Sequence, residues 1–126
     1  MTRVLLVGLV PETVDFSDPA LPPGMTAEKI HAGVAVALKQ MADRGWQAED
    51  LMFEAEACAE ALKARLAGQR YDCIVVGAGV RLPPRNLHLL ETAINTIAAA
   101  APGTPIAFNT TPLDSADAAA RWLDRS

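Results

Sequence analysis

The sequence has few aromatic residues, no excess of positive charge and only two cysteines. Aromatic residues make up 5% of its 126 positions, and 11 Lys and Arg residues are outnumbered by 15 Asp and Glu residues. Nucleic-acid binding uses basic side chains for phosphates and aromatic rings for bases, so we expect no nucleic-acid partner. Cys58 and Cys73 have no CxxC spacing and lie on apolar faces, which predicts reduced, buried thiols.

Long hydrophobic runs are also missing. The apolar run at residues 4–7 is too short to cross a bilayer, and no small-residue cleavage pattern follows it. We therefore expect no membrane partner and a cytoplasmic protein. A chain of 126 residues is long enough to bury its own core, which predicts a single domain over residues 1–126.

Four short segments have the pattern of buried strands, and each is followed by a segment with helical spacing of apolar residues. The strands are predicted at residues 3–9, 47–53, 71–76 and 105–108. The helices are predicted at about residues 27–44, 56–67, 87–101 and 114–123. Four such βα units predict a three-layer, Rossmann-like or flavodoxin-like α/β domain, whose four-stranded parallel sheet has the order 2-1-3-4.

Helix ends and apolar stripes give further expectations. Thr26 is predicted to cap the first helix and Gly45 to end it, while Gly68 is predicted to close the second. Asn86 is predicted to cap the third helix, and Asp114 or Ser115 the fourth. The expected core stripe of the third helix consists of Leu87, Leu90, Ile94, Ile97 and Ala101.

The strand order predicts where a ligand site would lie. With the order 2-1-3-4 the topological switch point falls between the first and third strands, so the loops after Leu9 and Gly77 face each other across a crevice. The first of these loops, residues 10–25, carries four prolines and three acids. Loops of this length in small domains are usually functional or disordered.

A glycine-flanked turn follows the third predicted strand and leads to two arginines. Gly77 and Gly79 allow the backbone to approach a ligand, and Arg81 or Arg85 can hold an anion through its planar fork. Leu82 stands where a dinucleotide fingerprint needs its third glycine, and the chain has no P-loop motif. The glycines are equally explained by a tight exit from the strand, and the arginines by solvation or pairing with acids.

The candidate ligand-binding residues all fall at the same edge of the predicted sheet, and all but Gly8 lie in loops. Loop acids are usually solvated, and an amide and hydroxyl after the fourth strand also suit a turn, so each group has a purely structural alternative. The sequence indicates no metal site, and it leaves catalytic residues and cofactors open. The ten candidates are Gly8, Glu12, Asp15, Gly77, Ala78, Gly79, Arg81, Arg85, Asn109 and Thr110.

The two histidines give weaker signals. His88 and Glu91 lie one turn apart on the third helix, but without a second imidazole they make an incomplete zinc site and suit a surface hydrogen-bond pair better. His31 lies next to the apolar stripe of the first helix and has no carboxylate at i+4. We expect it to be half-buried.

Two motifs resemble a group of small α/β proteins of unknown function. They are the sequence Gly-Ala-Gly-Val-Arg at residues 77–81 and Phe-Asn-Thr-Thr-Pro at residues 108–112, with Arg121-Trp122 beyond them. The resemblance covers roughly the last 55 residues. It implies the fold and brings no activity with it.

Two functional hypotheses follow from the sequence. The favoured one is binding of a polar or anionic small metabolite at the carboxyl edge of the sheet. The alternative is a non-catalytic assembly protein that forms a homodimer through the alanines at residues 98–101 or through exposed apolar residues at 21–25.

Overall fold

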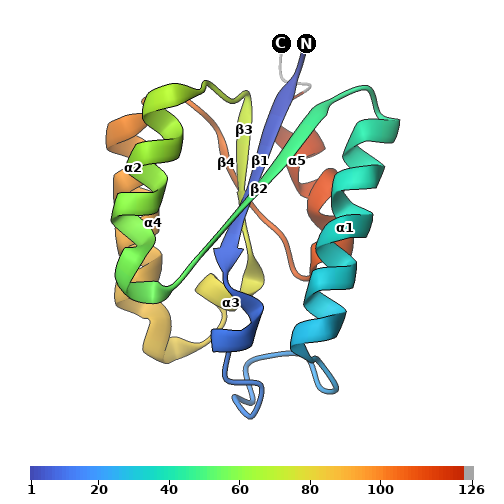
Figure 1. Ribbon diagram of the computed structural model, residues 1–126, viewed down its shortest axis with the longest axis vertical. Coiled ribbons are helices and arrows are strands. Elements are labelled where there is room, and N and C mark those ends of the chain that lie inside the picture. Colours follow the sequence, from blue (N-terminus) through green and yellow to red (C-terminus); the bar gives the residue numbers. More distant parts are fainter. Residues whose placement is uncertain (124–126) are drawn as a thin grey trace.

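A four-stranded parallel sheet forms the centre of the molecule and is covered by helices on both faces (Figure 1). The computed structural model describes residues 1–123. The strands are β1 (Arg3–Leu9), β2 (Gln47–Phe53), β3 (Cys73–Val76) and β4 (Ile106–Phe108), in the order β2-β1-β3-β4. The predicted fold class and strand order are therefore confirmed.

The helices form the two outer layers. The α-helices are α1 (Ala27–Asp43), α2 (Cys58–Gly68), α3 (Ala78–Arg81), α4 (Leu87–Ala100) and α5 (Ser115–Leu123). Short 3₁₀ turns occur at Pro11–Thr13, Ala55–Ala57, Pro84–Asn86 and Pro112–Asp114. In Figure 1, α2 and α4 lie on one side of the sheet and α1 and α5 on the other. None of the helices at residues 1–123 has the length and apolar content needed to cross a membrane.

Alternation along β1 explains why the sheet has two cores. Leu5 and Val7 pack with the buried residues of α2 and α4, while Val4 and Leu6 pack with those of α1 and α5. Successive side chains of a strand point to opposite faces, so a strand covered on both sides must be apolar throughout. This accounts for the continuous apolar run that identified β1.

Several predicted helix ends are correct. Thr26 accepts a hydrogen bond from the Lys29 backbone N–H, as an N-cap does. Gly45 follows α1 with a φ of +87°, a left-handed conformation that glycine adopts without strain.

Three predicted details of α2 and α4 are wrong. Gly68 is the last residue of α2 and not the residue beyond it. Leu87 is 63% exposed, because the buried stripe of α4 runs through Leu89, Ala93 and Ile97. The Asn86 side chain donates to the Gly79 carbonyl and does not cap α4.

The start of α5 also differs from expectation. Thr111 caps the 3₁₀ turn that leads into α5, and Asp114 completes a capping box with it. Neither Asp114 nor Ser115 is therefore the cap.

The short helix α3 was not predicted at all, because Pro83 and Pro84 lie just beyond it and bar any longer helix.

We predict that neither cysteine of the folded protein reacts with Ellman's reagent at pH 8. Cys58 and Cys73 are both free and buried, and burial raises the pKa of each thiol to about 11. Only roughly one thiol in a thousand would then be a thiolate at pH 8, and the thiolate is the reacting species. Both should react at once in 6 M guanidinium chloride. Rapid labelling of either thiol without denaturant would contradict the burial described here.

Candidate functional site

The carboxyl ends of the strands meet at the edge of the sheet where α3 begins. Gly77 follows β3, and its backbone N–H donates to the carbonyl of Val7 in β1 at 2.8 Å. A Cβ atom at Gly77 would lie 3.2 Å from that carbonyl oxygen. This distance is tighter than an ordinary van der Waals contact, so the close approach of β1 to the turn favours glycine here.

Gly79 is in a different position. It lies inside α3, its φ is not positive, and a Cβ atom there would meet no atom within 4 Å. Neither backbone conformation nor packing against the rest of the protein therefore requires glycine at this position. The missing side chain leaves open space at the edge of the sheet.

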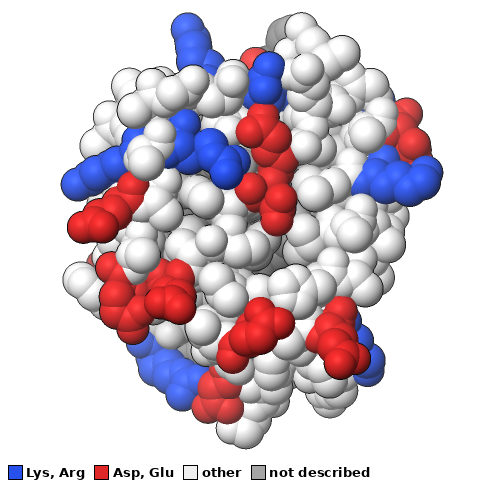
Figure 2. Space-filling view, in the orientation of Figure 1, with Lys and Arg blue, Asp and Glu red and all other residues white. Residues whose placement is uncertain are grey.

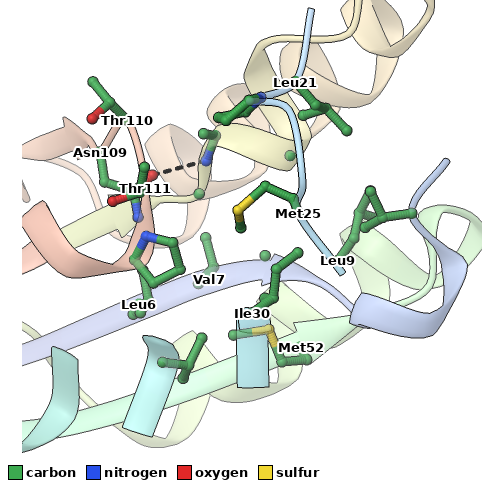
Figure 3. A pocket seen from close by; sticks show the side chains of 18 of the residues that line it. Leu6, Val7, Leu9, Leu21, Met25, Ile30, Met52, Asn109, Thr110 and Thr111 are labelled. Carbon is green, nitrogen blue, oxygen red and sulfur yellow. Dashed lines mark hydrogen bonds between the residues drawn. The ribbon is translucent and has the colours of Figure 1, made fainter. Parts of the chain in front are cut away.

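Asn109 holds this edge together. Its side chain is buried, and its Oδ1 accepts from the Ala78 backbone N–H at 2.8 Å (Figure 3). Its Nδ2 donates to the hydroxyl of Ser115, which is also buried, at 2.9 Å. One amide thus joins the end of β4 to the starts of α3 and α5.

Thr110 is also occupied by contacts within the protein. Its backbone N–H and hydroxyl both donate to the carboxylate of Asp114. Partial burial tends to raise the pKa of Asp114, but hydrogen bonds from Thr110 and Thr111 outweigh it and leave that pKa below its ordinary value. Asn109 and Thr110, both predicted ligand-binding residues, therefore shape the edge through contacts inside the protein.

Arg81 points away from the space beside Gly79. Its guanidinium donates to the Asn109 carbonyl at 2.9 Å and lies over the ring of Phe108, with 5.7 Å between its central carbon and the ring centroid. Its Nε is buried and has no hydrogen-bond partner among the described residues. Arg81 thus covers the end of β4.

The first loop, residues 10–25, folds over the edge and is tied to it by ion pairs. Arg85 lies 2.9 Å from the carboxylate of Asp15 and 4.0 Å from that of Asp18. Hydrogen bonds from Ser17, followed by one from Arg85, lower the pKa of Asp15. This part of the loop is therefore held against the segment that follows α3.

A second tie joins the loop to α1. His31 Nε2 lies 2.8 Å from the Glu12 carboxylate, and this hydrogen bond lowers the pKa of Glu12. The expectation that His31 is half-buried is wrong, since its side chain is 56% exposed. Its carboxylate partner comes from the loop, which spacing along the helix could not reveal.

Beneath the loop lies a nearly apolar cavity of about 70 Å³, called here the inner cavity. Leu9, Met25 and Ile30 converge on it in Figure 3, from β1, the loop and α1 respectively. Of the predicted residues, Gly8, Gly77, Ala78, Gly79, Asn109 and Thr110 line it.

A larger space of about 590 Å³, called here the outer cleft, lies on the other side of the loop. Its lining mixes apolar and polar groups, among them Thr13, Asp15, Glu54, Glu56, Arg85 and Asn86. The predicted residues Asp15, Gly79 and Arg85 line it, whereas Glu12 and Arg81 line neither space. The predicted crevice is therefore divided in two.

Some residues of both linings were not among those predicted from the sequence. Met52 lines the inner cavity, and Glu54 and Glu56 follow β2 on the outer cleft. The predicted strand order places β2 beside β1, so the loop after β2 could have been assigned to this edge. Leu21 and Met25, proposed as part of an exposed dimer surface, are instead half-buried in the wall of the inner cavity.

The remaining candidates contribute no site. His88 and Glu91 are exposed on α4, and no hydrogen bond or ion pair joins their side chains in the described structure. Within residues 1–123, no three His, Cys, Asp or Glu residues are grouped so as to hold a metal ion. Comparison of the sequence with models of known families and with curated proteins finds no match. The resemblance to small proteins of unknown function stays a prediction.

We predict opposite effects for alanine at the two glycines of the turn. Gly77→Ala should lower the free energy of unfolding by about 1–3 kcal/mol, because the new methyl group meets the Val7 carbonyl. Gly79→Ala should leave stability unchanged or raise it by up to about 1 kcal/mol, since alanine favours the helix. Urea unfolding followed by circular dichroism measures both. Equal destabilisation would show that Gly79 is also needed by the fold.

Proposed function

We propose that this protein binds a small polar metabolite at the carboxyl edge of the sheet, beneath and beside the first loop. The observation that carries the proposal is the pair of hollows at the switch point between β1 and β3. Ligands of open α/β sheets bind at such switch points, and ligand sites are concave and mostly apolar with a few polar groups.

The two linings indicate how such a metabolite would be oriented. The inner cavity offers almost no polar surface, so a polar group placed there would lose its hydrogen bonds to water without replacement. The outer cleft offers hydroxyl, amide and charged groups. A bound metabolite would therefore keep its polar groups on the outer side.

An anionic metabolite is a more specific form of the same proposal and would depend on Arg85. Arg85 is the only Lys or Arg among the described residues that line either space. It is already paired with Asp15 and Asp18. An anion would have to displace these carboxylates, whereas an uncharged ligand would not.

The binding proposal is tested by a thermal-shift panel of nucleotides, sugar phosphates, carboxylates and amines on the wild type, Arg85→Ala and Arg70→Ala. A ligand at a hundred times its dissociation constant stabilises a protein by about 2.7 kcal/mol, or several degrees in melting temperature. We expect at least one compound to do so, with the Arg70→Ala control unchanged.

A shift lost in Arg85→Ala would identify an anionic ligand, and one kept would identify an uncharged or cationic ligand. If no class of compound shifts the melting temperature, the proposal of a metabolite site is wrong. Saturation of the shift with concentration would separate specific binding from a general effect of salt.

Homodimer formation is the second candidate function, and one observation favours it. Leu87 is 63% exposed on α4, and Ala98 lies three helical turns beyond it on the same face and is also exposed. Small residues allow a second helix to approach closely.

We also propose a cytoplasmic location, to which two free, buried thiols are suited.

For the dimer we predict a molar mass twice that of the chain by light scattering at high micromolar concentration, and a monomer for Leu87→Glu. Leu113→Glu is the matched control, because Leu113 is 57% exposed beside α5 and lies outside this face. A monomeric wild type would rule out assembly through α4. A control variant that also dissociates would place the contact elsewhere.

A further inference from the structure

Three residues lie on the lining of both the inner cavity and the outer cleft. They are Leu9 at the end of β1, Val14 in the first loop and Gly79 in α3. The two spaces therefore share one wall, and this wall is only one layer of residues thick. Val14 is half-buried within it.

The two spaces differ in size and in the apolar surface that they offer a ligand. Sites for small molecules usually measure about 300–1,000 Å³. The inner cavity, at about 70 Å³, is far below this range and suits only the end of a molecule. The outer cleft, at about 590 Å³, is large enough but offers less apolar surface to hold a ligand.

Gly79 provides a second, independent observation. Its α-helical conformation and the empty space around it mean that the fold would accept a larger residue. Because Gly79 lines both spaces, a side chain at this position would reduce the room available where they adjoin.

The loop side of the wall is held from outside by exposed groups. Val14 is followed by Asp15, whose partner Arg85 is 56% exposed. Ion pairs between exposed side chains contribute little to stability. Displacement of Val14 therefore requires the loss of its backbone hydrogen bond to Pro11, of the weak ion pair beside it and of apolar contacts that a ligand can replace.

The charges around the outer cleft favour some head groups over others. Three carboxylates, those of Asp15, Glu54 and Glu56, face one arginine in its lining, and that arginine is already paired. Acidic side chains also outnumber basic ones at the lower end of the face shown in Figure 2, where the strands end. An anionic head would be repelled here, whereas an uncharged or cationic one would not.

We infer that a single ligand spans both spaces, with a short apolar end in the inner cavity and an uncharged or cationic polar head in the outer cleft. This inference rests on the proposed function and specifies its ligand class. Val14 moves aside when the ligand binds, and Gly79 leaves room for the ligand to pass.

The experiment uses n-propylamine, n-butylamine, n-pentylamine and n-hexylamine as probes, with the carboxylates of equal chain length as comparisons. The methyl signals of Met25 and Met52 report on the inner cavity in NMR titrations, and the amide signals of Thr13 and Glu54 report on the outer cleft. We expect both sets to shift with one dissociation constant. Each added methylene should raise affinity about fourfold until the inner cavity is full.

Gly79→Leu and its matched control Gly68→Leu complete the experiment. Gly68 also lies in a helix, and a Cβ atom added there would have no other atom within 4 Å. Unlike Gly79, it lines neither the inner cavity nor the outer cleft. Gly79→Leu should weaken amine binding at least tenfold, and Gly68→Leu should leave it unchanged. Amide spectra of both variants establish that each is folded.

Three results would overturn the inference. Shifts confined to one set of signals would show that the ligand does not span the wall, and tighter binding of the carboxylates would contradict the assigned head group. Absence of any shift would exclude an amphipathic amine site. The thermal-shift panel tests the proposed function separately. If a compound of the panel stabilises the protein but no amine binds, only the inference is overturned and the proposed function stands.

Discussion

The buried side chain of Asn109 is the contact on which the carboxyl edge of the sheet depends. The side chain accepts from the Ala78 backbone N–H and donates to the Ser115 hydroxyl. The backbone carbonyl of Asn109 accepts from the Arg81 guanidinium. A buried polar group left without a partner costs about 1–3 kcal/mol, so these bonds are costly to break. Three elements are thereby fixed in position, and the wall of the inner cavity beneath Gly77 is fixed with them.

This arrangement separates the rigid side of the site from its adjustable side. The rigid side consists of β1, the turn into α3 and the end of β4, joined by backbone and side-chain hydrogen bonds. The opposite side is the first loop, whose ties to Arg85 and His31 are exposed. Because exposed ion pairs are screened by salt and by water, the loop is held mainly by the apolar residues that it contributes to the inner cavity.

The sequence predicted the sheet well because the fold is determined by local patterns that agree with one another. Continuous apolar strands alternate with amphipathic helices, and this alternation allows few topologies. The position of the two hollows followed from the strand order. The roles of Arg81 and Asn109 did not, because whether a polar group faces a ligand or the protein depends on partners 28 and 31 residues away. Spacing along the chain contains no such information.

Gly77 and Gly79 show the same limit most clearly, since they are the same residue type two positions apart and serve different purposes. Register decides the first: Val76 pairs with Val7, which brings the next residue against the β1 carbonyl and leaves little room for a side chain. No such contact exists at Gly79, which lies on the lining of both hollows. Register and packing therefore account for glycine at position 77, whereas neither accounts for glycine at position 79.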